Sequence, residues 1–252
     1  MDRIRAFVFD LDGVIVDTAG FHFLAGRRLA RELGGELGAA DNERLKGVSR
    51  MASLDIILSL AGVEASPERK LELADKKNAW YREYLATMDP SGVLPGAREF
   101  VLAAREAGLR TAIASASKNT STILEATGIA GLFDAVADGH KAERAKPAPD
   151  VFLKAAEELG LPPTACVVFE DAAAGIEGAI AAGMATVGIG DPDILSRADI
   201  VLPNLVGIGP AGLLGLLAKA ESGRGRSAGP GGAGGPGGAG AKGGPGGTRG
   251  GR

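Results

Sequence analysis

Short apolar runs alternate with longer amphipathic stretches along most of the chain. Each short run is bounded by polar or glycine residues, which predicts strands buried on both faces. The predicted strands are Ala6–Phe9, Thr111–Ala114, Ala135–Ala137, Cys166–Phe169, Ala185–Ile189 and Ile200–Leu202. Because helical patterns separate most of these runs, we expect an α/β fold with a doubly wound, mostly parallel sheet.

The gap between the first two predicted strands is far too long for a single crossover helix. Within it, apolar residues recur at spacings of three and four over Phe21–Leu33, Met51–Leu60 and Pro67–Ala86, which is the periodicity of helices. We therefore expect a discontinuous α/β core, residues 1–16 and 89–221, and a helical-bundle cap over residues 17–88. The two linkers could act as hinges.

The composition changes near the C-terminal end. The 252 residues carry a formal charge of −3 and include 40 glycines. Residues 222–252 are rich in Gly, Pro and Arg and hold no acidic or large apolar side chain, so we expect this tail to be disordered. The remaining body is acidic. The tail lacks the aromatic side chains that stack on bases, which makes a solubilising extension a better interpretation than nucleic-acid binding.

Other features narrow the class of protein. No stretch of the sequence has the length and hydrophobicity of a membrane helix, and the first apolar run ends at Asp10, too early for a signal-peptide core. The single Cys166 cannot form an internal disulfide, which fits a reducing compartment. We expect a cytoplasmic, monomeric protein with no membrane partner.

Carboxylates follow two of the predicted strands. Asp10 and Asp12 come after the first strand, and Glu170 and Asp171 follow the fourth. Ligands of doubly wound sheets bind at the carboxyl ends of the strands. Four carboxylates there would repel one another without a cation, and oxygen ligands favour Mg²⁺ over Zn²⁺. The alternatives are solvated acids at a strand end and, for Glu170 and Asp171, acids at a helix N-terminus.

Two more segments at the same edge could bind an anion. Ser115 ends the second strand, and residues 117–119 lead into a helix whose first N–H groups suit a phosphate. Ordinary N-capping is the alternative. Lys146 is held extended by Pro147, although a single lysine is more often a solvated surface charge.

In this order, these segments resemble the haloacid dehalogenase-like (HAD) superfamily of phosphotransferases, over residues 4–205. The resemblance implies a Rossmann-like core in which Asp10 is the nucleophile that forms an aspartyl phosphate and Asp12 is the general acid and base. A general acid must keep its proton near neutral pH, so we expect the pKa of Asp12 to lie above that of Asp10. The resemblance also implies the phosphate ligands Ser115, Ala116, Asn119 and Lys146 and one Mg²⁺ held by Asp10, Asp12, Glu170 and Asp171.

Within that superfamily, the cap is similar to that of the β-phosphoglucomutase family. The similarity is carried by Gly13–Thr18 with Phe21–Phe23, Leu45–Arg50, Lys76–Asn78 with Tyr81, and Ala114–Asn119. It implies a sugar-phosphate substrate and β-glucose 1,6-bisphosphate as the priming phosphodonor. The residues that it implies at the substrate are His22, Lys46, Gly47, Val48, Ser49, Arg50, Lys77, Asn78, Tyr81, Ser117 and Lys118. Arg50 would clamp the phosphate that is not transferred, and Thr18 would support Asp12 at the hinge.

The chain departs from that family at two positions. Gly26 stands where these mutases carry a bulky aromatic residue facing the substrate, which would loosen the packing around the sugar, and Ala172 replaces a Ser. The alternative function is a sugar-phosphate phosphatase of the same superfamily. A binding protein that uses its basic Gly-rich tail is a third hypothesis.

Several cap residues also have a structural interpretation. Lys77 and Asn78 could lie on a solvated helix face, and Tyr81 could simply pack in the core. His22 could be a buried helix residue bonded to the backbone. Spacing alone does not choose between these interpretations and contact with a substrate.

Overall fold

The computed structural model describes residues 4–45 and 48–227. Within this part of the chain, parallel strands form one sheet in the order β3-β2-β1-β4-β5-β6. The strands are β1 (Ala6–Phe9), β2 (Arg110–Ala114), β3 (Ala135–Ala137), β4 (Cys166–Glu170), β5 (Ala185–Ile189) and β6 (Ile200–Leu202). The predicted α/β fold class and parallel sheet are confirmed.

Alternate residues of each strand face opposite sides of the sheet. On one face, Phe7, Phe9 and Phe169 form an aromatic layer, with the rings of Phe9 and Phe169 stacked at 4.6 Å. The other face carries smaller residues such as Ala6 and Val8. The helices against the aromatic face are α5 (Ala97–Glu106), α6 (Thr120–Ala126) and α9 (Pro210–Ser227), and those against the other face are α7 (Asp150–Leu159) and α8 (Ala173–Ala181).

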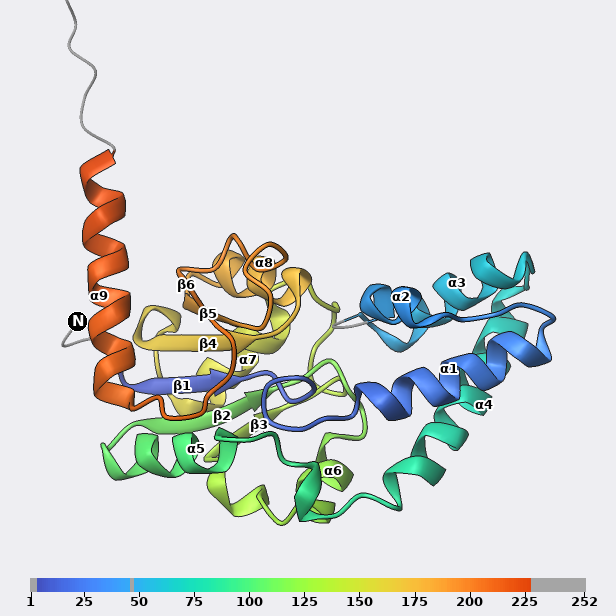
Figure 1. Ribbon diagram of the computed structural model, residues 1–252, viewed down its shortest axis with the longest axis horizontal. Coiled ribbons are helices and arrows are strands. Elements are labelled where there is room, and N and C mark those ends of the chain that lie inside the picture. Colours follow the sequence, from blue (N-terminus) through green and yellow to red (C-terminus); the bar gives the residue numbers. More distant parts are fainter. Residues whose placement is uncertain (1–3, 46–47, 228–252) are drawn as a thin grey trace, which may run out of the picture.

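Of the α-helices between β1 and β2, the first four form a body beyond the carboxyl ends of the strands (Figure 1). They are α1 (Ala19–Glu32), α2 (Ala39–Asn42), α3 (Arg50–Ala61) and α4 (Pro67–Leu85), and α1, α3 and α4 pack against one another. We call residues 19–85 the helical insert. The longer helices agree with the predicted ones to within two residues, while the division of the chain into domains at 16/17 and 88/89 stays a prediction.

The sequence sets the ends of the insert helices locally. Ser49 and Ser66 precede α3 and α4, and each hydroxyl accepts a backbone N–H from the first turn. Gly62 ends α3 with a φ of 65°, a conformation that glycine adopts without strain. Short 3₁₀ turns complete the helical elements: η1 (Glu43–Leu45), η2 (Pro90–Gly92), η3 (Ala130–Leu132) and η4 (Pro163–Ala165).

The two segments that join the insert to the sheet run side by side. Val16 forms an isolated bridge with Val93, and Leu94 donates its N–H to the carbonyl of Ile15 at 2.9 Å. Asp17 donates its N–H to Gly92 at 3.0 Å. Both linkers therefore leave the sheet at one place, beside Asp12.

The C-terminal helix corrects one boundary. The tail was expected to be disordered from Ser222, but α9 continues to Ser227. The Ser222 hydroxyl donates to the carbonyl of Ala218, so its polar group is satisfied within the helix. Residues 228–252 lie outside the described part of the chain. No helix in the described part is both long and apolar enough to cross a bilayer.

Candidate active site

Lys146 joins two carboxylates at the carboxyl end of the sheet. Its buried ammonium donates to Asp10 Oδ1 and to Glu170 Oε1, each at 2.5 Å. The backbone N–H of Asp10 is itself bonded to the carbonyl of Phe169, which ties the end of β1 to β4. Although burial opposes the charge, the two carboxylates raise the pKa of Lys146. The structure thus brings together three residues that the sequence placed on separate strand ends.

Two glycines make room for the acidic side chains. A Cβ atom on Gly175, in the first turn of α8, would lie 1.8 Å from Glu170 Oε1. A Cβ on Gly13 would lie 2.1 Å from Asp171 Oδ2, and Gly13 also has a φ of +85°, which disfavours other residues. Sequence analysis missed the role of Gly175, because no local pattern shows which side chain folds back over it.

The site offers an oxygen-rich group of ligands for a cation. One carboxylate oxygen each from Asp10, Glu170 and Asp171 lies within 4.8 Å of the others, and we call these residues the acidic cluster. Three carboxylate oxygens are the donor set of a hard divalent ion such as Mg²⁺, so the residues present fit the ion used by HAD enzymes. The Asp12 side chain is not part of this cluster, and its predicted contribution to the metal site has no support from its carboxylate.

Asp12 instead accepts a hydrogen bond from the buried hydroxyl of Thr18, at the start of the helical insert. Burial, together with the nearby carboxylate of Asp10, raises the pKa of Asp12 to about 7. Asp12 can therefore hold a proton near neutral pH, as the sequence-based hypothesis of a general acid requires.

His22 and Tyr81 form a stacked pair above Asp12. Their rings lie 4.0 Å apart with an interplanar angle of 15°, and both residues line the same cavity as Asp12. Burial and the cations Lys77 and Arg50 lower the pKa of His22 to about 3, so its ring is neutral. The Tyr81 hydroxyl is buried near Thr18 and Asp12, and burial raises its pKa.

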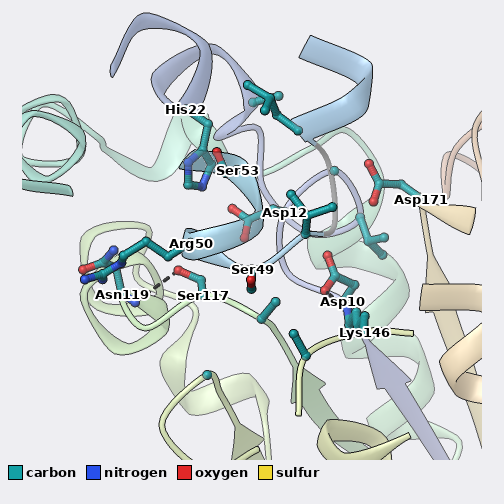
Figure 2. A pocket seen from close by; sticks show the side chains of 18 of the residues that line it. Asp10, Asp12, His22, Ser49, Arg50, Ser53, Ser117, Asn119, Lys146 and Asp171 are labelled. Atoms are coloured by element: carbon teal, nitrogen blue, oxygen red, sulfur yellow. Dashed lines mark hydrogen bonds and ion pairs between the residues drawn. The ribbon is translucent and has the colours of Figure 1, made fainter. Parts of the chain in front are cut away.

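A second polar group lies across the cavity. Its members are Arg50, Lys77 and Asn78 from the helical insert and Lys118 and Asn119 from the loop after β2, and we call it the distal cluster. In Figure 2, Arg50 and Asn119 lie on one side of the view, and Asp10, Lys146 and Asp171 lie on the other. The cavity between the two groups measures about 920 Å³.

The distal cluster contains a direct hydrogen bond between its two segments and is positively charged. The Asn119 amide donates to Asn78 Oδ1 at 3.0 Å, which joins the loop to α4. Lys77 is 5% exposed, and burial beside Arg50 lowers its pKa to about 8. Arg50 contacts Asp75 at 3.4 Å, a partner that the sequence analysis missed even though Asp75 lies one turn before Asn78. This region can therefore hold a second anion.

The remaining predicted residues are placed as follows. Val48, Ser49, Ala116 and Ser117 line the cavity. Ser115 is fully buried and accepts the N–H of Ser117, so it does not line the cavity. Lys46 and Gly47 lie outside the described residues. Ser53, which sequence analysis also missed, lines the cavity from α3.

Gly26 is buried within α1 and does not itself line the cavity. A Cβ atom on Gly26 would lie 3.0 Å from Leu37, 3.4 Å from Ile57 and 3.7 Å from Leu45, and Leu45 lines the cavity. The glycine therefore serves the packing of the insert, while its expected effect on the packing around a sugar stays a prediction.

The fold and the site define a known class of enzyme. The sequence model of the haloacid dehalogenase-like hydrolases matches residues 4–183, and the chain belongs to this family. A β-phosphoglucomutase of Bacillus subtilis is 38% identical over 201 residues, which cover 79% of this chain and 89% of that protein. The crystal structure of a β-phosphoglucomutase from Clostridium difficile has a TM-score of 0.82 and 35% identity, and it covers 87% of this chain and 99% of that one.

The relatives also include phosphatases. A fructose-1-phosphate phosphatase of Escherichia coli is 33% identical over 192 residues, which cover 75% of this chain and 97% of that protein. Family membership therefore establishes HAD-type phosphoryl chemistry, and the choice between transfer to a sugar and transfer to water depends on the site.

Proposed function

We propose that this chain is a Mg²⁺-dependent β-phosphoglucomutase. It would interconvert β-D-glucose 1-phosphate and glucose 6-phosphate through an aspartyl phosphate on Asp10 and a bound β-glucose 1,6-bisphosphate. The observation that carries the proposal is the presence of the distal cluster opposite Asp10 in one cavity. A bisphosphate intermediate needs two anion sites in one chamber, whereas a phosphatase needs one.

The first step forms the bisphosphate. The sugar 6-hydroxyl of β-glucose 1-phosphate attacks the phosphorus of the aspartyl phosphate, and the bond from phosphorus to Asp10 breaks. Asp12 accepts the hydroxyl proton, while the 1-phosphate is held by the distal cluster. Asp12 suits this role because its raised pKa lets it take up a proton near neutral pH.

In the second step, a phosphoryl group returns to Asp10. This step follows after the bisphosphate has turned around in the cavity, so that its 1-phosphate lies at Asp10. The Asp10 carboxylate attacks the 1-phosphate, the bond from phosphorus to sugar O1 breaks, and Asp12 donates its proton to O1. Lys146, held against Asp10 at 2.5 Å, balances the charge that spreads over the transferred oxygens. Bound Mg²⁺ would add further charge stabilisation, held by the acidic cluster.

The helical insert would favour transfer of the phosphoryl group to the sugar over transfer to water. The insert side of the cavity is lined by Tyr81, Leu45 and Val48. Apolar walls of this kind keep solvent away from a reactive intermediate. The hydrogen bond between Asn119 and Asn78 links the insert to the loop beside the nucleophile. In this setting, a bound sugar hydroxyl would attack the aspartyl phosphate before water could.

A sugar-phosphate phosphatase is the second candidate, and the similarity to a fructose-1-phosphate phosphatase favours it. The two functions differ in the fate of the phosphoryl group. A phosphatase would release inorganic phosphate from several sugar phosphates and would not need a bisphosphate.

A coupled assay for glucose 6-phosphate tests the proposal. β-glucose 1-phosphate and its α anomer are each supplied with Mg²⁺, with and without β-glucose 1,6-bisphosphate. We expect turnover of the β anomer that depends on the bisphosphate and little turnover of the α anomer. Release of phosphate without glucose 6-phosphate would instead favour the phosphatase.

A further inference from the structure

A second loop packs against the anion-binding loop. The β2 loop (residues 115–119) borders the cavity, and the β3 loop (residues 138–140) contacts it through backbone and side-chain hydrogen bonds, with Gly139 also lining the cavity. Gly139 donates its N–H to the carbonyl of Ser117 at 3.1 Å, and His140 Nε2 lies 3.2 Å from the carbonyl of Lys118. Since a carbonyl can only accept, His140 must donate through a protonated Nε2.

The contact requires a glycine at position 139. A Cβ atom there would lie 2.4 Å from the carbonyl oxygen of Ala116 and 3.1 Å from Cγ of Lys118. Asp138 stabilises the β3 loop by accepting the N–H of His140 at 2.9 Å. The β3 loop is therefore shaped to approach the β2 loop closely.

These bonds decide which groups of the β2 loop remain available. The carbonyl and N–H of a trans peptide point in opposite directions. Holding the carbonyl of Ser117 against Gly139 therefore turns the N–H of Lys118 the other way. Within the described residues, the N–H groups of Ala116 and Lys118 have no protein acceptor, and both residues line the cavity.

His140 acts on the next peptide in the same way. Its bond to the carbonyl of Lys118 orients the N–H of Asn119, which donates to Ser117 Oγ at 3.1 Å. Because Ser117 Oγ already accepts this bond, its own proton is left to donate to another group. Ser117 lines the cavity, where the acceptor would be a phosphate oxygen.

We propose that His140 is a positioning residue that fixes the β2 loop in its anion-binding conformation. It holds the carbonyl of Lys118, which would repel a phosphate, against His140, a residue that does not line the cavity, and leaves N–H and O–H donors of the loop to the ligand. The identity of the substrate in this inference rests on the proposed function, so the binding of inorganic phosphate is measured separately from turnover.

The experiment compares wild type with His140→Ala and His140→Gln. Glutamine keeps an N–H donor of similar reach, whereas alanine removes it. The control is Lys141→Ala, because Lys141 contacts Val136 and Glu158 and leaves the β2 loop untouched. Dissociation constants for inorganic phosphate are measured by calorimetry on the Mg²⁺-loaded enzyme, together with kcat and KM for β-glucose 1-phosphate.

Loss of one net hydrogen bond predicts that His140→Ala weakens phosphate binding by about three- to tenfold. We expect KM to rise by a similar factor and kcat to stay within about twofold, with recovery in His140→Gln and no change in Lys141→Ala. Because His140 is exposed, thermal unfolding should be unchanged. If wild type made no glucose 6-phosphate, the proposed function would fail while the phosphate titration still tested His140. Unaltered phosphate binding in His140→Ala, or a glutamine variant no better than alanine, would overturn the proposal.

Discussion

Asn119 donates a 3.0 Å hydrogen bond to Asn78 and so connects the anion-binding loop of the sheet to helix α4 of the insert. The two residues lie 41 positions apart in the sequence. Both belong to the distal cluster, so the contact that holds the insert over the cavity is also part of the second anion site. Under the proposed function, this contact would couple the position of the insert over the cavity to the binding of a phosphate at the distal cluster.

Replacing Asn78 by Ala should therefore affect both binding and protection from water. Loss of the hydrogen bond predicts a KM for β-glucose 1-phosphate about three- to tenfold higher. We also expect a larger share of phosphoryl groups to be lost as inorganic phosphate, measured as the ratio of phosphate to glucose 6-phosphate. The control Glu72→Ala lies on the same helix and loses an exposed ion pair with Arg69, so it should leave this ratio unchanged. An unchanged ratio in Asn78→Ala would contradict the coupling.

Asp12→Asn should abolish turnover and stabilise the fold above neutral pH. The folded state holds the Asp12 proton up to about pH 7, whereas the unfolded chain loses it near the ordinary pKa of an aspartate, 3.8. The free energy of unfolding of the wild type therefore falls as pH rises from about 4 to 7. Asp12 is only half-buried, which moderates this cost, so we expect the metal-free variant to be more stable by about 2 kcal/mol at pH 8.

Urea unfolding of both proteins across this pH range checks the prediction. The two free energies of unfolding should converge near pH 4, where Asp12 is protonated in both states of the wild type. A constant difference across the whole range would show that Asp12 has no raised pKa.

Gly175→Ala should damage the metal site although Gly175 itself offers no ligand atom. The new methyl group would collide with Glu170 Oε1, which is bonded to Lys146. We expect activity to fall and the Mg²⁺ concentration for half-maximal activity to rise by about ten- to a hundredfold, as for other groups that orient ligands. Gly20→Ala, in helix α1 with open space around it, serves as a control that should keep full activity. A normal Mg²⁺ titration of Gly175→Ala would refute this role.

Lys77→Met should weaken substrate binding while it stabilises the protein. Lys77 makes no hydrogen bond or ion pair within the described residues, and burial lowers its pKa to about 8. Because the Lys77 ammonium would donate a charge-assisted hydrogen bond to phosphate, we expect KM to rise by about ten- to a hundredfold in the variant. The neighbouring Lys76→Met, which loses only an exposed pair with Glu32, provides the comparison.

The stability effect of Lys77→Met has a definite pH dependence. Below pH 8 the folded wild type keeps a buried charge on Lys77, and this cost disappears as pH rises from 8 to the ordinary lysine pKa of 10.5. The gain in free energy of unfolding should thus be present at pH 7 and vanish above about pH 10.5. Equal stability of variant and wild type at pH 7 would contradict the assignment.

The sequence predicted the fold well because its signals are local. The strands are short runs such as Ala6–Phe9 that are buried on both faces, and serines before α3 and α4 mark where those helices begin. The meeting of Asp10 with Lys146 could also be predicted, because parallel strands end at one edge of a sheet. Roles that follow from the order of strand ends are thus accessible from sequence.

Other features depend on contacts that no local pattern records. The surroundings of Gly26 depend on how Leu37, Leu45 and Ile57 pack against α1, which the sequence around Gly26 does not show. The closeness of Gly175 to Glu170 and the bond from His140 to Lys118 join separate segments through tertiary packing. The tail was predicted to begin at Ser222, where glycine, which disfavours helix, becomes frequent. Helix α9 nevertheless continues through glycines to Ser227.

The fate of the phosphoryl group on Asp10 tests the central claim most directly. The phosphoenzyme is prepared with a labelled phosphodonor and Mg²⁺, freed of excess donor, and then mixed with buffer alone or with β-glucose 1-phosphate. We predict slow release of labelled phosphate in buffer, rapid transfer of label to the sugar, and no labelling of Asp10→Asn. Rapid hydrolysis at the same rate with and without the sugar, or labelling that survives Asp10→Asn, would contradict the account.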